Sequence, residues 1–293
     1  MNIQNITNKL NAYERLMRLD KLIGILLLLW PTLWALLIAG HGKPDWIIVL
    51  IFVTGTVLMR SAGCVMNDIA DSKFDGLVER TKNRPLATQE VSKKEAYILA
   101  LVLSFLAFGL VCTLNALTIK LSFVALLLAA TYPLTKRFFV IPQAYLGIAF
   151  GAGIPMAFAA ITGEIPTEAW ILLLANVFWA IAYDTEYAMV DRDDDLKIGI
   201  KSSAITFGRF DVLAVMACYA ITLLLLAIVG ARLAFSYAYY GGLIIAATIA
   251  AFHYYLIQTR NKAKCFQAFL HNTWFGFVVF AGLATQYLIQ YNS

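Results

Sequence analysis

Two sets of acidic and amide side chains stand out because each repeats at the spacing of one helix face. The first set is Asn67, Asp71 and Asp75. The second set is Asp184, Asp191 and Asp195. A step of four residues advances only about 40° around a helix axis, so the members of each set share a face if the segments are helical. Carboxylates gathered in this way repel one another, and a bound cation would relieve that repulsion.

The chemistry that this oxygen-rich pattern favours is magnesium-assisted handling of a diphosphate. Mg²⁺ takes oxygen ligands and is usually held by one or two carboxylates together with substrate phosphate. Two facing sets would hold two Mg²⁺ ions with a diphosphate between them, where the metals offset charge that builds on a phosphate leaving group. Basic residues that follow each set, or that end the fourth apolar run, could donate to phosphate oxygens. They are Arg80, Lys82, Arg84, Lys136, Arg137, Lys197 and Lys201.

The elements that must position these residues are membrane-spanning helices. Of the 293 residues 61% are apolar and 14% are charged, whereas soluble domains are about half apolar and one quarter charged. This excess excludes an ordinary soluble enzyme, a disordered chain and a disulfide scaffold. Continuous apolar runs predict nine helical spans. They lie near residues 23–39, 46–65, 96–114, 117–131, 145–161, 169–187, 212–231, 235–257 and 273–289.

The charged residues predict how these helices are oriented. With the N-terminus inside, 19 of the 23 Lys and Arg residues fall in inner segments and three in outer loops. This split predicts a cytoplasmic N-terminus. Residues 1–21 read as a basic amphipathic helix on the membrane surface. We expect one polytopic domain, 1–293, with its chemistry in cytoplasmic loops 66–95 and 188–211. The basic residues serve topology and phosphate, so no nucleic-acid partner is expected.

The acidic and basic motifs resemble those of a known family. Asn67-Asp68-x-x-Asp71-x-x-x-Asp75 is similar to the first aspartate motif of the UbiA superfamily of intramembrane aromatic prenyltransferases. Tyr132-x-x-x-Lys136 resembles its intermediate motif, and Asp191-x-x-x-Asp195 its second. Two longer stretches, 80–86 and 184–192, resemble the branch that prenylates 4-hydroxybenzoate in bacterial ubiquinone synthesis.

The resemblance implies a fold and a set of roles. It implies about nine transmembrane helices around a central cavity that opens to the cytoplasmic face of the bacterial inner membrane. Two Mg²⁺ ions would bind a polyprenyl diphosphate. Their ligands would be Asn67, Asp71, Asp75, Asp191 and Asp195, with Asp68 as a further ligand or a supporting residue. Arg18, Tyr132 and Lys136 would contact the diphosphate, together with the downstream basic residues.

The expected reaction is electrophilic substitution. The allylic C–O bond ionises, and the allyl cation attacks the ring carbon ortho to the hydroxyl of 4-hydroxybenzoate. Asp184 or Asp191 could polarise the phenol or take the ring proton. Arg60 and Arg137 are equal candidates for binding the carboxylate of 4-hydroxybenzoate.

Alternatives remain open at this point. A related prenyltransferase with another acceptor, such as a naphthoate, homogentisate or haem, would use the same metal site. A transporter of divalent cations or organic anions would place its ionisable residues near the membrane midplane, whereas here they gather at one face. Trp30, Trp34, Trp46 and Trp170 are expected as interface anchors rather than as part of the chemistry.

Overall fold

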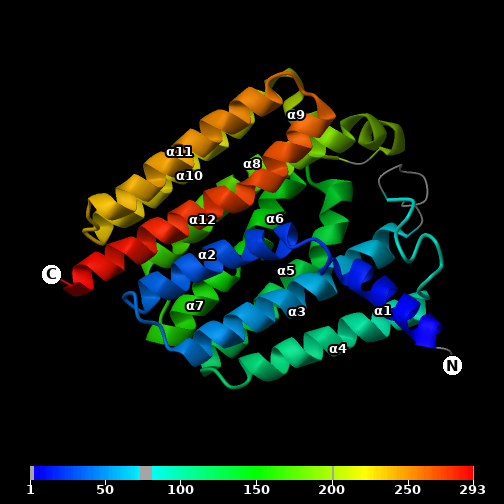
Figure 1. Ribbon diagram of the computed structural model, residues 1–293, viewed down its shortest axis with the longest axis horizontal. Coiled ribbons are helices and arrows are strands. Elements are labelled where there is room, and N and C mark those ends of the chain that lie inside the picture. Colours follow the sequence, from blue (N-terminus) through cyan, green and yellow to red (C-terminus); the bar gives the residue numbers. More distant parts are fainter. Residues whose placement is uncertain (1–2, 73–80, 200, 293) are drawn as a thin grey trace. The chain divides into compact units, whose positions relative to one another are not determined.

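The computed structural model describes residues 3–72, 81–199 and 201–292, and these residues form helices and connecting turns without a strand. Figure 1 labels the helices along the chain. Their bounds are α1 Ile3–Met17, α2 Ile23–Ala39, α3 Trp46–Asp71, α4 Lys93–Val111, α5 Ala116–Phe138, α6 Pro142–Gly151, α7 Gly153–Thr162, α8 Thr167–Ile198, α9 Ser203–Phe207, the 3₁₀ turn η2 Gly208–Phe210, α10 Asp211–Arg232, α11 Tyr237–Ile257 and α12 Lys262–Asn292.

The chain divides into two compact units. The first unit contains Met1–Ile25 and Val53–Leu114, and the second contains Leu26–Phe52 and Asn115–Ser293. Helices α2 and α3 therefore contribute residues to both units. The first carboxylate set lies in the first unit, and the second set lies in the second unit.

The first unit is built around the apolar face of α1. Ala12 and Leu16 are buried in one cluster with Val65 and Ile69 of α3 and with Ala96 of α4. The packing of α1 against protein therefore uses part of the apolar stripe predicted to lie on the membrane surface.

The polar face of α1 also meets the start of α4. Lys9 Nζ lies 2.8 Å from Glu95 Oε1, and Arg15 pairs with Glu90. Ser92 caps α4 by accepting a hydrogen bond from the Glu95 amide, while the Glu95 side chain accepts one from the Ser92 amide. These contacts tie the N-terminal helix to the first unit.

The second unit is organised around α8, which packs against α6, α10 and α12. Helices α10, α11 and α12 run alongside one another (Figure 1). Gly242 of α11 and Gly282 of α12 allow a close approach, because a Cβ at Gly242 would lie 2.9 Å from the Gly282 Cα. The Gly151–Gly153 stretch marks the break between α6 and α7, which agrees with the kink that small residues allow there.

A stack of aromatic side chains joins α2 to α8 within the second unit. The rings of Trp34 and Trp179 lie 5.3 Å apart at 29°, and Trp179 also stacks on Phe275. The Trp34 indole donates a hydrogen bond to the Gly276 carbonyl at 3.0 Å. The expectation that Trp34 anchors the membrane interface is therefore wrong, because α12 and Trp179 bury it completely. Trp46 and Trp170, in contrast, are exposed.

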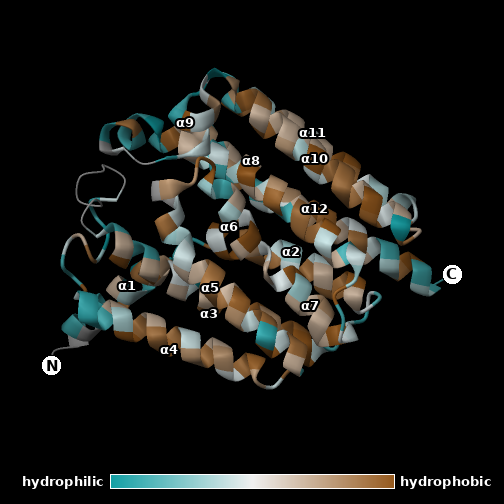
Figure 2. Cartoon of the chain, turned by 180° about the vertical axis from the view of Figure 1, so that it is seen from behind, coloured by the Kyte–Doolittle hydropathy of each residue, from teal (hydrophilic) through white to brown (hydrophobic). Residues whose placement is uncertain are grey.

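Seven helices in the described part of the chain are long and apolar enough to cross a membrane. Helix α2 is apolar but shorter, and α8 is apolar mainly in its first half. Each predicted apolar run falls on a helix or, at 145–161, on the α6–α7 pair. Figure 2 shows the hydrophobic colouring along α10, α11 and α12, with hydrophilic residues toward the helix ends. The chain is therefore an all-helical, multi-pass membrane protein.

Several helices, α5 among them, extend beyond the apolar runs that predicted them. Helix α3 continues to Asp71, α8 to Ile198, and α12 begins at Lys262. Hydropathy marks only the segments that would cross lipid, whereas backbone hydrogen bonding continues the helices beyond it. The start of the first predicted cytoplasmic loop and most of the second are consequently helical, so helix geometry fixes the spacing of the acidic residues there.

Candidate active site

The first carboxylate set lies at the end of α3. Asn67 and Asp71 are one turn apart and half-buried, and Asp71 is the last residue of the helix. The prediction that α3 continues far enough to place them on one face is therefore confirmed. Asp75 and Arg80 lie outside the described residues.

Asp68 differs from its neighbours because it is buried and paired with arginines. Its carboxylate accepts hydrogen bonds from Arg18 Nη2 at 3.0 and 3.2 Å and forms an ion pair with Arg84 Nη1 at 3.0 Å. Arg18 lies in the turn after α1 with φ of 58°, and its Nη1 donates to the Arg15 carbonyl. Asp68 thus holds two of the predicted phosphate-binding arginines beside the end of α3.

Arg60 occupies the same helix face two turns before Asn67. Its guanidinium packs against Gly24, where an added Cβ would lie 2.6 Å from both Nε and Nη2. The absence of a side chain at position 24 therefore leaves the space that the guanidinium fills.

The second carboxylate set lies along the end of α8. Asp184, Asp191 and Asp195 are half-buried, and all three fall within the one helix. Their predicted common face is thus present. The other two acids of this run pair with lysines instead: Asp193 with Lys262 at 2.9 Å and Asp194 with Lys197 at 3.1 Å.

Lys262 also affects the pKa of Asp193. Its hydrogen bond and its positive charge lower the pKa of that carboxyl below the ordinary value. The two lysine pairs separate Asp193 and Asp194 from the predicted ligands, although all of these acids belong to one run in the sequence.

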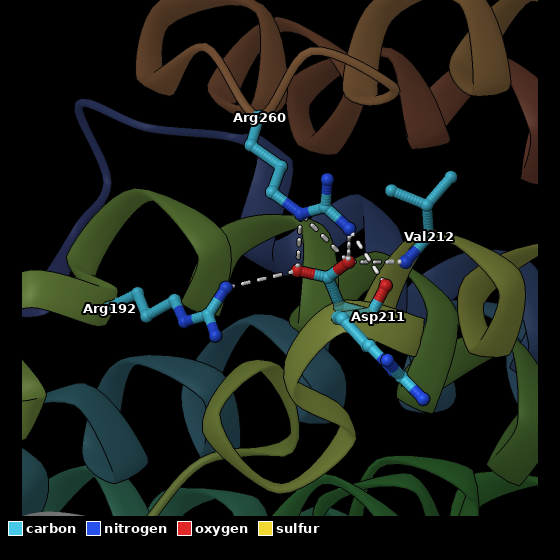
Figure 3. Close-up of polar contacts among 5 residues, drawn as sticks. Arg192, Asp211, Val212 and Arg260 are labelled. Carbon is cyan, nitrogen blue, oxygen red and sulfur yellow. Dashed lines mark hydrogen bonds and ion pairs between the residues drawn. The ribbon is translucent and has the colours of Figure 1, made fainter.

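A buried carboxylate holds the end of α8 to the neighbouring helices (Figure 3). Asp211, the first residue of α10, is fully buried and accepts hydrogen bonds from Arg260 Nη2 at 2.7 Å and from the Val212 amide at 2.7 Å. Arg192 approaches it from α8, with Nη1 3.4 Å from Asp211 Oδ2. Because Arg192 directly follows Asp191, this cluster ties the second carboxylate set to α10 and to the α11–α12 turn.

Further hydrogen bonds hold the other sides of α8. The hydroxyls of Thr185 and Ser203 lie 2.6 Å apart, and the Ser203 amide donates to Gln143 of α6. Asn176 donates to the Gly147 carbonyl at 2.8 Å. The helix that carries the second set is therefore fixed by polar contacts with α6, α9 and α10.

The remaining predicted phosphate ligands are placed less uniformly. Tyr132 is half-buried in α5. Lys136 and Arg137 also belong to α5, but their side chains lie outside what the structure describes. Lys82 and Lys197 are exposed. Lys201 Nζ lies 3.4 Å from the Phe138 carbonyl at the end of α5.

The donor types suit a hard divalent cation. Each unit supplies two oxygen-bearing side chains one turn apart: Asn67 and Asp71 in the first, Asp191 and Asp195 in the second. This is the kind of set that Mg²⁺ uses when water and phosphate complete its coordination. Within residues 3–72, 81–199 and 201–292, His, Cys, Asp and Glu side chains form no group of three that would hold a metal by themselves.

The sequence analysis missed three residues that matter in the second unit. Asp211 and Arg260 gave no signal, because their partners are 49 positions away in the chain. Glu186 did carry a signal: an acidic residue inside a predicted membrane span is rarely without a role.

Comparison with known proteins assigns the fold and family. Residues 28–280 match the UbiA prenyltransferase family. The chain belongs to this family. A relative from Methylobacillus flagellatus, described as 4-hydroxybenzoate octaprenyltransferase, is 66% identical over 97% of this chain and 96% of its own length. A protein of the same description from Thiobacillus denitrificans is 64% identical over 98% of each chain.

Solved structures of the family agree with the fold. A UbiA homologue from Aeropyrum pernix K1 matches with a TM-score of 0.79 and 24% identity, over 89% of this chain and 97% of its own. A homologue from Archaeoglobus fulgidus, described as bound to GPP and Mg²⁺, matches with a TM-score of 0.70 and 18% identity, over 92% and 99% of the two chains.

Proposed function

We propose that this membrane protein transfers a polyprenyl group from polyprenyl diphosphate to the ring carbon ortho to the hydroxyl of 4-hydroxybenzoate, in ubiquinone biosynthesis. The observation that carries this proposal is the 66% identity, over nearly the whole of both chains, with a relative described as a 4-hydroxybenzoate octaprenyltransferase. Few residues of either chain lie outside this match.

The diphosphate end of the substrate is assigned to the acidic and basic residues of both units. Asn67, Asp71 and Asp75 would hold one part of the metal site, and Asp191 and Asp195 the other. Mg²⁺, with two ions expected, would neutralise the charge that gathers on pyrophosphate as the allylic C–O bond breaks. Arg18 and Arg84, held by Asp68, would donate to phosphate oxygens. We assign Asp68 this supporting role because two arginines already contact its carboxylate.

The same role for phosphate is proposed for a second group of residues. They are Arg80, Tyr132, Lys136, Lys197 and Lys201. Lys197 already pairs with Asp194, so its share in binding requires that pair to open.

Binding of 4-hydroxybenzoate requires a cation for its carboxylate. The reaction also requires a group that polarises the phenol or takes the ring proton. Arg60 is favoured over Arg137 for the carboxylate, because Gly24 gives its guanidinium a defined place beside the first carboxylate set. Asp184 is favoured for the phenol or for the departing ring proton, because Asp191 is assigned to the metal and a metal-bound carboxylate is a poor base.

The proposed topology has nine spans. Seven helices meet the requirement for length and apolarity, and α2 and α8 are assigned as the other two. We assign the N-terminus and the acidic helix ends to the cytoplasmic face, an orientation that the distribution of Lys and Arg supports. The bacterial inner membrane is proposed as the location. The prenyl tail would lie among apolar helix faces.

Product analysis by mass spectrometry tests the proposal. Detergent-solubilised protein is incubated with Mg²⁺, 4-hydroxybenzoate and prenyl diphosphates of graded length. The expected product is 4-hydroxybenzoate with one prenyl group at the ring carbon ortho to the hydroxyl. Prenylation of a naphthoate or homogentisate but not of 4-hydroxybenzoate would reassign the acceptor. Absence of pyrophosphate release with every acceptor would reject the enzyme class.

A further inference from the structure

A buried polar cluster lies on the opposite side of α8 from its predicted metal ligands. Glu186 is fully buried within the stretch predicted as the sixth span. Its Oε2 accepts a hydrogen bond from Asn272 Nδ2 at 2.8 Å, and its Oε1 lies 3.0 Å from the Tyr219 hydroxyl. His253 Nδ1 lies 2.8 Å from that hydroxyl and 3.4 Å from Glu186 Oε1. We call Glu186, Tyr219, His253 and Asn272 the Glu186 cluster.

The hydrogen-bonding groups of the Glu186 cluster have consistent partners. Asn272 Oδ1 accepts from the Trp179 indole at 2.8 Å. The Tyr219 hydroxyl lies 2.8 Å from Asn272 Oδ1 and 3.0 Å from Glu186 Oε1, so its single hydrogen has an acceptor on either side. The Tyr219 oxygen can in turn accept from His253 Nδ1 in the tautomer that carries its hydrogen on that nitrogen. His253 Nε2 lies 3.1 Å from Nδ1 of the half-buried His271. The carboxylate therefore receives hydrogen bonds from partners that belong to α10 and α12, with α11 contributing the histidine behind them.

The position of Glu186 on the helix relates this cluster to the metal ligands. At about 100° per residue, Glu186 lies roughly 140° to 160° around α8 from Asp184 and Asp191. The face that carries Glu186 also carries Ala175, Trp179 and Ala182, all fully buried. One face of α8 is thus packed against α10 and α12, and the opposite face presents the second carboxylate set.

Polar and apolar contacts restrain a helix differently. Small apolar residues such as Ala175 and Ala182 specify the rotation of a helix less sharply than a hydrogen bond does, because dispersion is non-directional. A buried carboxylate with fixed donors has a single satisfied arrangement. A rotation of α8 by one residue would leave the Glu186 carboxylate among apolar groups without its hydrogen bonds, which is costly. The cluster therefore fixes the rotation and the axial register of α8.

We infer that Glu186 is a positioning residue, which sets through Tyr219 and Asn272 the direction in which α8 presents Asp184, Asp191 and Asp195. This inference depends on the proposed function, because it gives the presented face its role in binding magnesium diphosphate. Glu186 itself touches neither substrate nor metal in this scheme. It acts through the orientation of the helix that carries the ligands.

An exchange of side chains between positions 186 and 272 tests this role. Glu186→Gln replaces one of the two acceptor oxygens by an NH2 group, so that Asn272 or Tyr219 loses its acceptor. Asn272→Asp places a carboxylate against the Glu186 carboxylate. Combining the two restores a donor opposite an acceptor, now in the reverse direction. The carboxylate introduced at position 272 could still accept from Trp179 and Tyr219. We expect each single variant to bind a prenyl diphosphate more weakly by about tenfold, the effect of one lost buried hydrogen bond, and the double variant to recover most of that loss.

The measurement is Mg²⁺-dependent binding of farnesyl thiodiphosphate, an unreactive analogue, to the solubilised full chain by calorimetry. This readout requires no acceptor, so it separates the positioning role from the assignment of 4-hydroxybenzoate as substrate. Gln286→Met is the matched control. It removes the contacts of Gln286 with Ser236, which join the outer end of α12 to the start of α11 without involving α8. We expect it to leave analogue binding unchanged even where it lowers the melting temperature.

Two results would overturn the inference. One is a double variant that binds no better than the worse single variant while melting like the wild type. The other is Tyr219→Phe, which removes only the hydroxyl, binding the analogue and turning over as the wild type does. Tyr219→Phe also decides the matter if neither charge-altering single variant accumulates in the membrane.

Discussion

Arg260 lies over the buried carboxylate of Asp211, with its Nε 3.1 Å from both carboxylate oxygens and its Nη2 2.7 Å from Oδ1. The carboxylate raises the pKa of Arg260, so the guanidinium stays charged throughout the accessible pH range. Arg192 completes the cluster from α8. Asp211 therefore links Arg260, in the turn between α11 and α12, to Arg192, which directly follows Asp191 in α8.

Replacing Arg260 by Ala should destabilise the protein. The change removes the hydrogen bonds that Arg260 donates to the buried Asp211 carboxylate. A buried acceptor that loses its donor costs about 1–3 kcal/mol. We expect a lower melting temperature in detergent. Arg232→Ala is the control, because it breaks an ion pair with Glu168 at an exposed position, where such pairs contribute about 0–1 kcal/mol. Equal melting temperatures for the two variants would contradict the stabilising role of the Asp211 cluster.

Asp191 and Asp193 should differ sharply when each is changed to Asn. Asp191 belongs to the presented face of α8, whereas Asp193 is exposed and paired with Lys262. We expect Asp191→Asn to lower kcat by about 100-fold or more, as loss of a group that stabilises the transition state does. Asp193→Asn should retain activity within about threefold, as expected when an exposed ion pair is removed. Steady-state release of pyrophosphate measures both, and comparable losses would show that the run acts as one charge cluster.

Gly24→Ala should act through Arg60. The added methyl would lie 2.6 Å from the guanidinium nitrogens, so the Arg60 side chain must move. If Arg60 binds the acceptor carboxylate, KM for 4-hydroxybenzoate rises while KM for the prenyl diphosphate changes little.

Gly63→Ala is the matched control for that experiment, because a Cβ there, on helix α3 of the same unit, meets no atom within 4 Å. An unchanged KM for 4-hydroxybenzoate in Gly24→Ala, together with an increase in Arg137→Gln, would assign the carboxylate to Arg137 instead.

Removal of divalent cations should stop turnover. Asn67, Asp71, Asp191 and Asp195 supply oxygen ligands but no positive charge of their own, so the diphosphate would be repelled without metal. We expect EDTA to abolish product formation and excess Mg²⁺ to restore it, as followed by mass spectrometry. Full turnover by thoroughly chelated protein would exclude the proposed arrangement.

The approximate positions of most helices could be predicted, because they follow from the order of apolar and charged residues along the chain. Apolar runs located the helices, and the four-residue spacing placed Asn67 with Asp71 and Asp191 with Asp195 on shared faces. The lengths of α8 and α12 could not be predicted in this way, since hydropathy ends where the charged residues begin. Trp34 was misassigned because composition alone does not distinguish an indole at the interface from one that α12 and Trp179 bury.

The partners of single charged residues could not be predicted either. The four-residue spacing already separates Asp195 from Asp193, but it does not predict that Asp193 pairs with Lys262 of α12. Asp211 likewise depends on Arg192 of α8 and on Arg260 of the turn between α11 and α12. Contacts between distant segments have no signature in spacing, so the ion-pair partners of Asp193 and Asp211 could be identified only from the structure.

The stacked indoles of Trp34 and Trp179 give this protein a natural optical reporter. Rings 5.3 Å apart couple their electronic transitions, so the pair should contribute a paired band to the circular dichroism spectrum that is lost when the rings separate. Because one ring belongs to α2 and the other to α8, that signal follows the assembly of the second unit during detergent extraction or reconstitution, without any label.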